Sequence, residues 1–323
     1  MSEPLLQVAG LSTQFHTQAG VVKAVSDVSF SLERGQILGL VGESGSGKSV
    51  TGFSLLGLVD PPGRIAEGSI RFDGQELVGM PQPDLRALRG KRIAMVFQDP
   101  MMTLNPVLSV GTQMTLAVRA HDKVSKQMAR DRAVEALTRV GIPDAGHRLD
   151  AYPHQFSGGM RQRVAIAIAM IHSPDIIIAD EPTTALDVSI QAQILHEMRE
   201  LAKDSGTALI WISHDLATVS SLAERLLVMY AGTIVEEGPT ARVLRNPRHP
   251  YTRGLLDSLP ATAPPGQNLQ QIPGSMPSLL ALPPGCAFAP RCSFASEVCN
   301  GDVPYLVTGP SAFRCHHPIG EAK

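Results

Sequence analysis

The sequence predicts an α/β fold with a mostly parallel sheet and helices on both of its faces. Three observations indicate this class. A glycine-rich loop at residues 42–49 lies between an apolar run, 37–41, and a stretch of helical character, 50–59. A second apolar run, the β-branched residues 176–178, has the composition of a buried strand and leads into two carboxylates. Around these runs, segments of strand and helix character alternate along the chain.

The composition fits a globular chain and excludes some functions. The 323 residues are enough for one large α/β domain and a smaller appendage. The formal net charge of -2 lacks the basic footprint of a nucleic-acid-binding protein. We see no signal peptide at the N-terminus, and no apolar run approaches the ~20 residues that span a bilayer. If the protein works at a membrane, we expect it to dock on another protein.

The first hundred residues contain an antiparallel β region. Residues 5–8 and 21–32 alternate apolar and polar side chains, which predicts antiparallel strands ahead of the glycine-rich loop. An Asp-Pro-Pro-Gly break at 60–63 is followed by short strands at 68–74 and 92–97. We therefore expect an antiparallel β subdomain beside the main sheet.

Residues 101–172 are helical in character and predict an inserted helical subdomain. Apolar residues recur at helical spacing over 125–140, with charges between them. Residues 164–171 are apolar all round, which is typical of a buried helix. Strand and helix character then alternate again, and a hairpin is expected over 225–237.

The last part of the chain differs in composition. Residues 246–323 hold 13 of the 25 prolines and all four cysteines, with little periodicity. We therefore predict a nucleotide-binding domain at residues 1–245 and a loop-rich C-terminal extension at 246–323.

The loop at 42–49 fits the phosphate-loop pattern of Gly, four residues and Gly-Lys-Ser. Its glycines allow backbone N–H groups to turn inward on phosphate oxygens, and the following helix adds its dipole. Lys48 is placed to reach the β- and γ-phosphates, and Ser49 to bind Mg²⁺. A glycine-rich turn that binds nothing is the alternative, which the flanking strand, helix and Lys-Ser pair disfavour. The predicted nucleotide-binding residues here are Gly42, Ser44, Gly45, Ser46, Gly47, Lys48, Ser49 and Val50.

Two carboxylates end the β-branched strand. Asp180 is placed to hold Mg²⁺, and Glu181 to act as the general base toward water. A chance pair of surface carboxylates is the alternative. Earlier in the chain, Ser157 occupies a helix N-cap position before a glycine-rich first turn, a second arrangement suited to an anion.

The run Phe-Ser-Gly-Gly-Met-Arg-Gln-Arg at 156–163 resembles the Leu-Ser-Gly-Gly-Gln signature of ATP-binding-cassette (ABC) ATPases. In that family two cassettes pair head to tail, and each signature closes over the nucleotide on the other's phosphate loop. The resemblance implies a P-loop NTPase fold of the ABC-cassette type, with Ser157, Gly158 and Gly159 as nucleotide contacts. Met160 replaces the usual Gln.

Other family motifs follow in order. Gln98 resembles the Q-loop glutamine, which senses the γ-phosphate, contributes to the Mg²⁺ site and couples to the transmembrane partner. Asp187 lies in a run similar to the D-loop, and His214 resembles the switch histidine at the γ-phosphate. As a lone residue, His214 would be read as structural. Phe15 is a candidate for the aromatic side chain that stacks on adenine, with a plain core position as the alternative.

Within the ABC family, this sequence is similar to the D-type ATPase subunit of oligopeptide/dipeptide importers. The runs at 97–106, 152–155, 182–188 and 249–252 and the Met at 160 carry this resemblance. It implies ATP and Mg²⁺ as ligands, a homologous partner ATPase, two transmembrane permease subunits and an extracytoplasmic peptide-binding protein. It also implies a place on the cytoplasmic face of the inner membrane and no nucleic-acid partner. The alternatives are an importer of nickel or another small solute, a non-transport ABC ATPase and a pure nucleotide-binding scaffold.

Four cysteines lie within thirty residues of the extension, with five, six and fifteen residues between them. A cytosolic location makes metal binding more plausible than disulfides, and the spacing lacks the Cys-x-x-Cys pairs of a zinc ribbon. The resemblance favours a [4Fe–4S] cluster, with zinc and free thiols as alternatives. His316 and His317 are possible substitute ligands or a solvated surface pair. The candidate metal ligands are Cys286, Cys292, Cys299 and Cys315.

Overall fold

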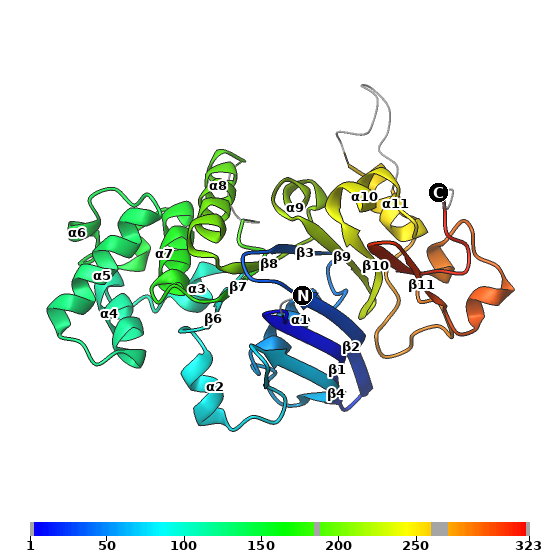
Figure 1. Ribbon diagram of the computed structural model, residues 1–323, viewed down its shortest axis with the longest axis horizontal. Helices are drawn as coiled ribbons and strands as arrows, with labels where there is room; N and C mark the ends of the chain where they lie inside the picture. Colours follow the sequence, from blue (N-terminus) through cyan, green and yellow to red (C-terminus); the bar gives the residue numbers. More distant parts are fainter. Residues whose placement is uncertain (1–2, 184–187, 260–270, 321–323) are drawn as a thin grey trace. The chain divides into compact units, whose positions relative to one another are not determined.

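The computed structural model describes residues 3–183, 188–259 and 271–320 (Figure 1). The chain divides into two compact units. Unit 1 comprises Met1–Leu32, Ile37–Gly79 and Ile212–Lys323, and unit 2 comprises Glu33–Gln36 and Met80–Trp211. The predicted boundary between residues 245 and 246 does not coincide with the division into these two units, and it stays a prediction.

The first sheet of unit 1 is antiparallel and has the strand order β2-β1-β4-β5. Its strands are β1 (Leu6–Thr17), β2 (Gly20–Leu32), β4 (Gly63–Phe72) and β5 (Gln75–Glu76). β1 lies between β2 and β4, which Figure 1 shows in blue and cyan. The expected antiparallel region is present, but β1 runs nine residues beyond the predicted 5–8 because a tight turn folds it directly onto β2.

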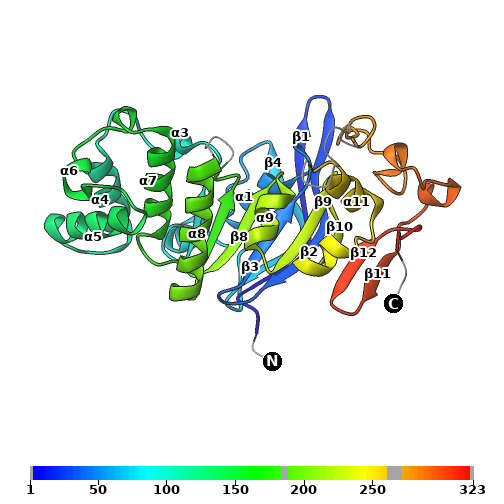
Figure 2. The same ribbon diagram turned by 90° about the horizontal axis from the view of Figure 1, so that it is seen from above.

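The second group of strands in unit 1 has the order β11-β12-β10-β9-β3. Its strands are β3 (Ile37–Val41), β9 (Arg225–Tyr230), β10 (Thr233–Pro239), β11 (Tyr305–Thr308) and β12 (Ser311–Arg314). β3 and β9 are parallel, whereas β9, β10, β12 and β11 pair antiparallel. The red hairpin β11–β12 in Figure 2 thus extends the sheet of β9 and β10 with strands from the C-terminal extension.

The α-helices in the described residues of unit 1 are α1 (Lys48–Leu55), α9 (Leu216–Leu222), α10 (Thr240–Arg245) and α11 (Pro250–Asp257). Helix α1 is shorter than the predicted 50–59 because Gly57 takes a left-handed backbone conformation, φ +59°, just after its end. In the described part of the extension, 3₁₀ helices lie at Ala289–Arg291 and Glu297–Asn300.

Unit 2 contains parallel strands and helices. β6 (Ile93–Val96) pairs in parallel with β7 (Ile176–Asp180), and β8 (Ala208–Ser213) follows in the order β8-β7-β6. All five residues of β7 are buried, as its β-branched composition predicts. The helices are α2 (Gln82–Leu88), α3 (Pro100–Thr103), α4 (Val110–His121), α5 (Lys126–Arg139), α6 (Ala145–Arg148), α7 (Gly158–Met170) and α8 (Val188–Ser205), with a 3₁₀ turn at Pro153–Gln155.

Serine caps define where three of these helices begin. The side chains of Ser109, Ser125 and Ser157 each accept a hydrogen bond from a backbone N–H in the first turn of α4, α5 and α7. Helix α7 is buried nearly all round from Gln162 onward, as predicted, and it begins at Gly158, directly after the predicted N-cap Ser157. Across the described ranges, no helix has the length and apolar character needed to cross a membrane.

Candidate nucleotide-binding and hydrolysis site

Glycine is required at both ends of the phosphate loop in unit 1. The loop joins β3 to α1. A Cβ on Gly42 would lie 2.1 Å from the Met229 carbonyl oxygen, and one on Gly47 would lie 2.3 Å from the Ala24 carbonyl oxygen. Gly47 also has φ +102°, a backbone conformation that side chains disfavour. The loop therefore packs against neighbouring backbone too closely for any other residue at these two positions.

Lys48 is held inside this loop. Its side chain is buried, and Nζ donates hydrogen bonds to the carbonyl oxygens of Gly42 (2.8 Å) and Glu43 (2.9 Å). The Ser46 hydroxyl is buried as well and has no hydrogen-bond partner among the described residues. A buried ammonium beside an unsatisfied hydroxyl favours an anionic ligand.

The open side of the loop lies at Ser44 and Gly45, which are both exposed. Ser49 and Val50 are half-buried in the first turn of α1. Helix α1 directs its N-terminal N–H groups and the positive end of its dipole toward the loop that it follows. These residues fit the polyphosphate that the sequence predicts.

Unit 2 brings two predicted catalytic residues together. Asp180 is the buried last residue of β7, and Glu181 follows with a left-handed φ of +44°. The Gln98 side-chain Nε2 donates a hydrogen bond of 3.2 Å to Glu181 Oε2. Because β6 and β7 are parallel, the residues after each strand share one edge of the sheet. The amide that resembles the Q-loop glutamine thus contacts the predicted general base.

The signature segment begins α7 and faces solvent. Ser157 accepts a hydrogen bond of 3.3 Å from the Met160 N–H, and Ser157 and Gly158 are exposed. A Cβ on Gly158 would meet no atom within 4 Å, whereas one on Gly159 would lie 3.0 Å from Ile190. The segment therefore presents a capped helix N-terminus with open space in front of its first glycine.

Three further predicted site residues are His214, Phe15 and Asp187. His214 is exposed and follows β8, within unit 1. Phe15 lies on β1, and its ring packs against the backbone of Gly63, the neighbouring residue on β4. Its role at adenine stays a prediction. Asp187 lies outside the described residues.

The four cysteines line one small cavity. Cys286, Cys292, Cys299 and Cys315 surround a space of about 10 Å³ together with His249, His316 and His317. All four thiols are free of disulfides. Within the described part of the chain, no group of three or more His, Cys, Asp or Glu residues is arranged to hold a metal ion.

The cysteine environment favours protonated thiols. Burial raises the pKa of Cys286 and Cys292, and it raises the pKa of Cys315 to about 11. Metals bind thiolates, so metal binding here requires the loss of these protons.

Two residues of the extension contact the phosphate loop, and no role was predicted for either from the sequence. Tyr251 accepts a hydrogen bond of 2.8 Å from the Glu43 N–H, and Arg291 forms an ion pair with the Glu43 carboxylate at 2.8 Å. Tyr251 lies in the 249–252 run that marks the importer subgroup, which was the only available signal.

Two families match this chain. The ABC transporter family matches residues 25–184, and the family described as "Oligopeptide/dipeptide transporter, C-terminal region" matches residues 235–299. A Brucella abortus (strain 2308) protein named "Putative peptide import ATP-binding protein" is 51% identical over 313 residues, covering 97% of this chain and 94% of the relative. A Brucella melitensis biotype 1 protein of the same description is 49% identical over 318 residues, with 95% and 94% covered.

Solved structures of ABC cassettes are similar to this chain as well. A dimeric ATP-binding cassette in a post-hydrolysis state, bound to ADP and Pi, is similar with a TM-score of 0.65 and 26% identity, covering 73% of this chain and 98% of the other. A Clostridium perfringens protein, part of an ABC transporter complex, is similar with a TM-score of 0.63 and 27% identity, covering 75% and 91%.

The fold and the phosphate loop together define a P-loop ATPase of the ABC-cassette class. Within that class, the chain belongs to the ATP-binding proteins of the oligopeptide/dipeptide transporter family. The predicted fold class, family and ATPase activity are confirmed.

Proposed function

We propose that this chain hydrolyses ATP in a head-to-tail pair of cassettes and that hydrolysis drives the import of di- or oligopeptides. The observation that carries the proposal is the exposed signature segment at the start of α7. A chain with one phosphate loop and one outward-facing signature needs a second cassette to complete each nucleotide site. The names of the Brucella relatives support the peptide cargo.

Lys48 and the N–H groups of the phosphate loop bind the β- and γ-phosphates in this proposal. Ser49, Gln98 and Asp180 hold Mg²⁺ through a hydroxyl, an amide oxygen and a carboxylate, oxygen donors that suit this ion. When bound, Mg²⁺ neutralises charge on the phosphate oxygens. Val50, in the first turn of α1, is a further contact to the nucleotide in this proposal. Phe15 stacks on the adenine ring.

Glu181 accepts the proton of the attacking water, and Gln98 orients its carboxylate through the 3.2 Å hydrogen bond. His214 contacts the γ-phosphate that leaves. Ser157, Gly158 and Gly159 bind the nucleotide held by the partner cassette, because a capped helix N-terminus favours an anion. Asp187 lies between the two sites.

The partners in this proposal are a homologous ATPase, two transmembrane permease subunits and an extracytoplasmic peptide-binding protein. The chain works at the cytoplasmic face of the inner membrane, with a nucleotide-binding domain at 1–245, including a helical subdomain at 101–172, and the extension at 246–323. An importer of nickel or another small solute is the second candidate, because the subgroup that this sequence resembles includes importers of peptides and of nickel.

The test uses the complete importer in lipid vesicles, with peptide-loaded binding protein outside. We expect peptide uptake that depends on ATP and hydrolysis stimulated by the loaded binding protein. In Glu181→Gln, hydrolysis should fall by about two orders of magnitude while ATP binding persists. Full hydrolysis in Glu181→Gln would contradict the assignment of Glu181 as the base. Hydrolysis that is stimulated by a nickel chelate but not by peptides would show that the cargo is nickel.

We further propose that the four cysteines bind a [4Fe–4S] cluster, with zinc as the alternative. The convergence of Cys286, Cys292, Cys299 and Cys315 on one cavity supports a shared ligand. The cavity of about 10 Å³ has room for about one water-sized sphere, so a cluster requires the cysteine loops to separate.

The measurement is an absorption spectrum with iron, sulfide and zinc analyses on protein purified without air. About four irons per chain with a broad visible band is the expected result. One zinc per chain and no colour would make the extension a zinc module. Four titratable thiols and no metal would refute both metal sites.

A further inference from the structure

Residues of the C-terminal extension hold the phosphate loop at Glu43. Tyr251, from α11, accepts a hydrogen bond from the Glu43 N–H, and Arg291, from a 3₁₀ turn of the extension, contacts the Glu43 carboxylate. Lys48 takes the third polar group of the same residue, because its Nζ donates to the Glu43 carbonyl oxygen. All of these groups lie in unit 1. Two of the three polar groups of Glu43, its N–H and its carboxylate, are therefore held by side chains of the extension.

The pair between Arg291 and Glu43 is bidentate and shielded. Nη1 donates to Oε2 at 2.8 Å and Nη2 donates to Oε1 at 3.1 Å, and the exposed fractions of the two side chains are 6% and 28%. Paired N–H donors in parallel fix both the distance and the plane of a carboxylate. Such a pair is worth more than a solvated surface ion pair.

Arg291 is itself immobilised. Its Nε donates to the Pro273 carbonyl oxygen at 2.8 Å, and its guanidinium lies over the rings of Tyr230 and Phe288, 5.8 Å and 6.0 Å from their centroids. The ring of Tyr251 packs against the same two aromatic rings. One aromatic cluster thus supports both groups that reach the loop.

Charge gives this arrangement a consequence for the nucleotide. Glu43 is an acidic residue inside a loop that binds a polyanion, so an unpaired carboxylate there would repel the phosphates. Arg291 neutralises the charge of the Glu43 carboxylate. By holding Glu43 in place, it also positions the Glu43 carbonyl oxygen that accepts a hydrogen bond from Lys48. Loss of Arg291 would leave a partly buried, uncompensated carboxylate beside the phosphates.

We propose that Arg291 and Tyr251 are positioning residues for ATP binding, so that the C-terminal extension is part of the nucleotide site. The inference rests on the proposed binding of ATP at the phosphate loop. Neither side chain touches the reacting atoms in this proposal. Both act through Glu43 on the shape and charge of the loop.

The test compares Arg291→Gln and Tyr251→Phe with wild type, in the complete transporter. We expect the Kd and KM for ATP to rise roughly tenfold in Arg291→Gln and several-fold in Tyr251→Phe, with kcat at saturating ATP changed less than about twofold. Arg291→Lys keeps the charge without the bidentate geometry, so its KM should lie between those of Arg291→Gln and wild type. Glu43→Gln with Arg291→Gln should bind ATP more tightly than Arg291→Gln alone, because the repelling carboxylate is gone.

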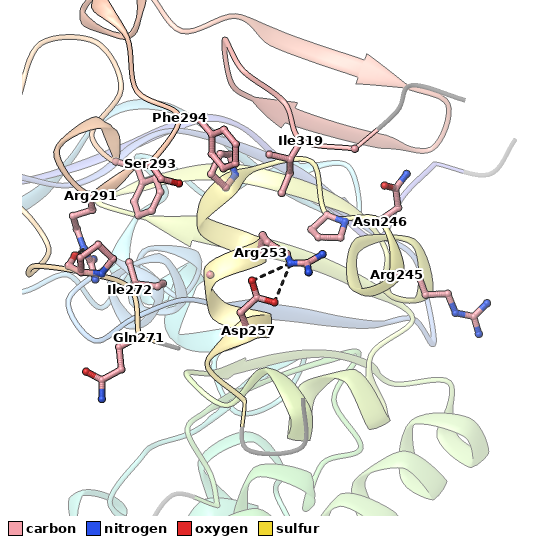
Figure 3. Close-up of a pocket in the computed structure, with 16 residues that line it drawn as sticks. Arg245, Asn246, Arg253, Asp257, Gln271, Ile272, Arg291, Ser293, Phe294 and Ile319 are labelled. Carbon is pink, nitrogen blue, oxygen red and sulfur yellow. Dashed lines mark hydrogen bonds and ion pairs between the residues drawn. The ribbon is translucent and has the colours of Figure 1, made fainter. Parts of the chain in front are cut away.

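Two matched arginines serve as controls. Arg314 joins the extension to Asp27 at 2.7 Å without touching the phosphate loop. Arg253 pairs with Asp257 in the 540 Å³ cavity that Arg291 also lines, as the dashed lines in Figure 3 show. We expect Arg314→Gln and Arg253→Gln to keep the wild-type KM for ATP.

The outcomes separate the two proposals. Wild-type protein that binds no ATP would refute the function itself. If wild type binds ATP and Arg291→Gln and Tyr251→Phe bind it equally well, only the positioning role is overturned. A fall in kcat with unchanged KM, matched by a lower melting temperature and a smaller folded fraction, would likewise overturn it in favour of a purely structural role.

Discussion

The two glycine-rich segments of this chain, the phosphate loop and the signature segment, are built in opposite ways. The phosphate loop is packed inside unit 1, with Gly42 and Gly47 against neighbouring backbone and Lys48 buried. The signature segment at Ser157 and Gly158 is exposed, and Ser157 caps it by accepting a hydrogen bond from the Met160 N–H.

The contrast separates what one chain can do alone from what needs a partner. A loop whose lysine and carbonyl groups are already hydrogen-bonded is preorganised to bind phosphates with little further ordering. An open helix N-terminus supplies donors and a dipole, but only a second molecule can bring it a ligand. We therefore expect changes in the loop to affect binding and hydrolysis together, and changes in the signature to affect hydrolysis alone.

The largest effect should come from Lys48→Ala. Removing the buried ammonium takes away the charge that faces the β- and γ-phosphates, so ATP binding should weaken and hydrolysis should fall by roughly a thousandfold. Titration with a fluorescent ATP analogue and a phosphate-release assay measure the two quantities. Arg253→Gln, which changes a cation outside the loop, is the control. Retained hydrolysis in Lys48→Ala would break the assignment of this loop.

Ser157→Arg should separate the two segments most clearly. The bulky cation replaces an exposed helix cap, so we expect hydrolysis in the assembled transporter to fall by roughly a hundredfold while the isolated chain binds ATP as wild type does. Phosphate release and nucleotide titration again give the two values. An equal loss of ATP affinity in the isolated chain would show that the signature belongs to the chain's own site, contrary to the comparison.

The sequence predicted the positions of both segments well, because each is encoded by consecutive residues. The Gly-Lys-Ser run fixed the position of the loop between β3 and α1, and the serine before two glycines located the start of a helix. The β-branched run 176–178 likewise located β7, because burial on both faces leaves a strong apolar pattern.

Long-range pairings were beyond the sequence. The hydrogen bond between Gln98 and Glu181 joins residues 83 positions apart, and the contact between Arg291 and Glu43 joins residues 248 positions apart. The strands β11 and β12 were missed because four-residue strands in a proline-rich region leave little periodicity. These features depend on tertiary packing, which a local pattern does not record.

A pair of glycine substitutions sharpens the comparison at the level of stability. Gly47→Ala must accommodate a Cβ 2.3 Å from the Ala24 carbonyl oxygen at a left-handed φ, so we expect a loss of about 2 kcal/mol in the free energy of unfolding. Gly158→Ala meets open space in a helix, so stability should stay unchanged or rise by up to about 1 kcal/mol. Urea unfolding without nucleotide measures both. Equal stability of the two variants would contradict the packing difference between the segments.

The smallest effect should come from Met160→Gln, which restores the residue usual at this place in the signature. The contact that defines the cap uses the Met160 backbone N–H, which any residue except proline supplies. Met and Gln have similar helix propensities, so the start of α7 should be unaffected. We therefore expect hydrolysis in the assembled transporter to change by less than about twofold. Met160→Pro, which lacks the N–H, is the opposite control and should lose the cap. A large gain or loss in Met160→Gln would show that the side chain, and not the backbone, contacts the partner's nucleotide.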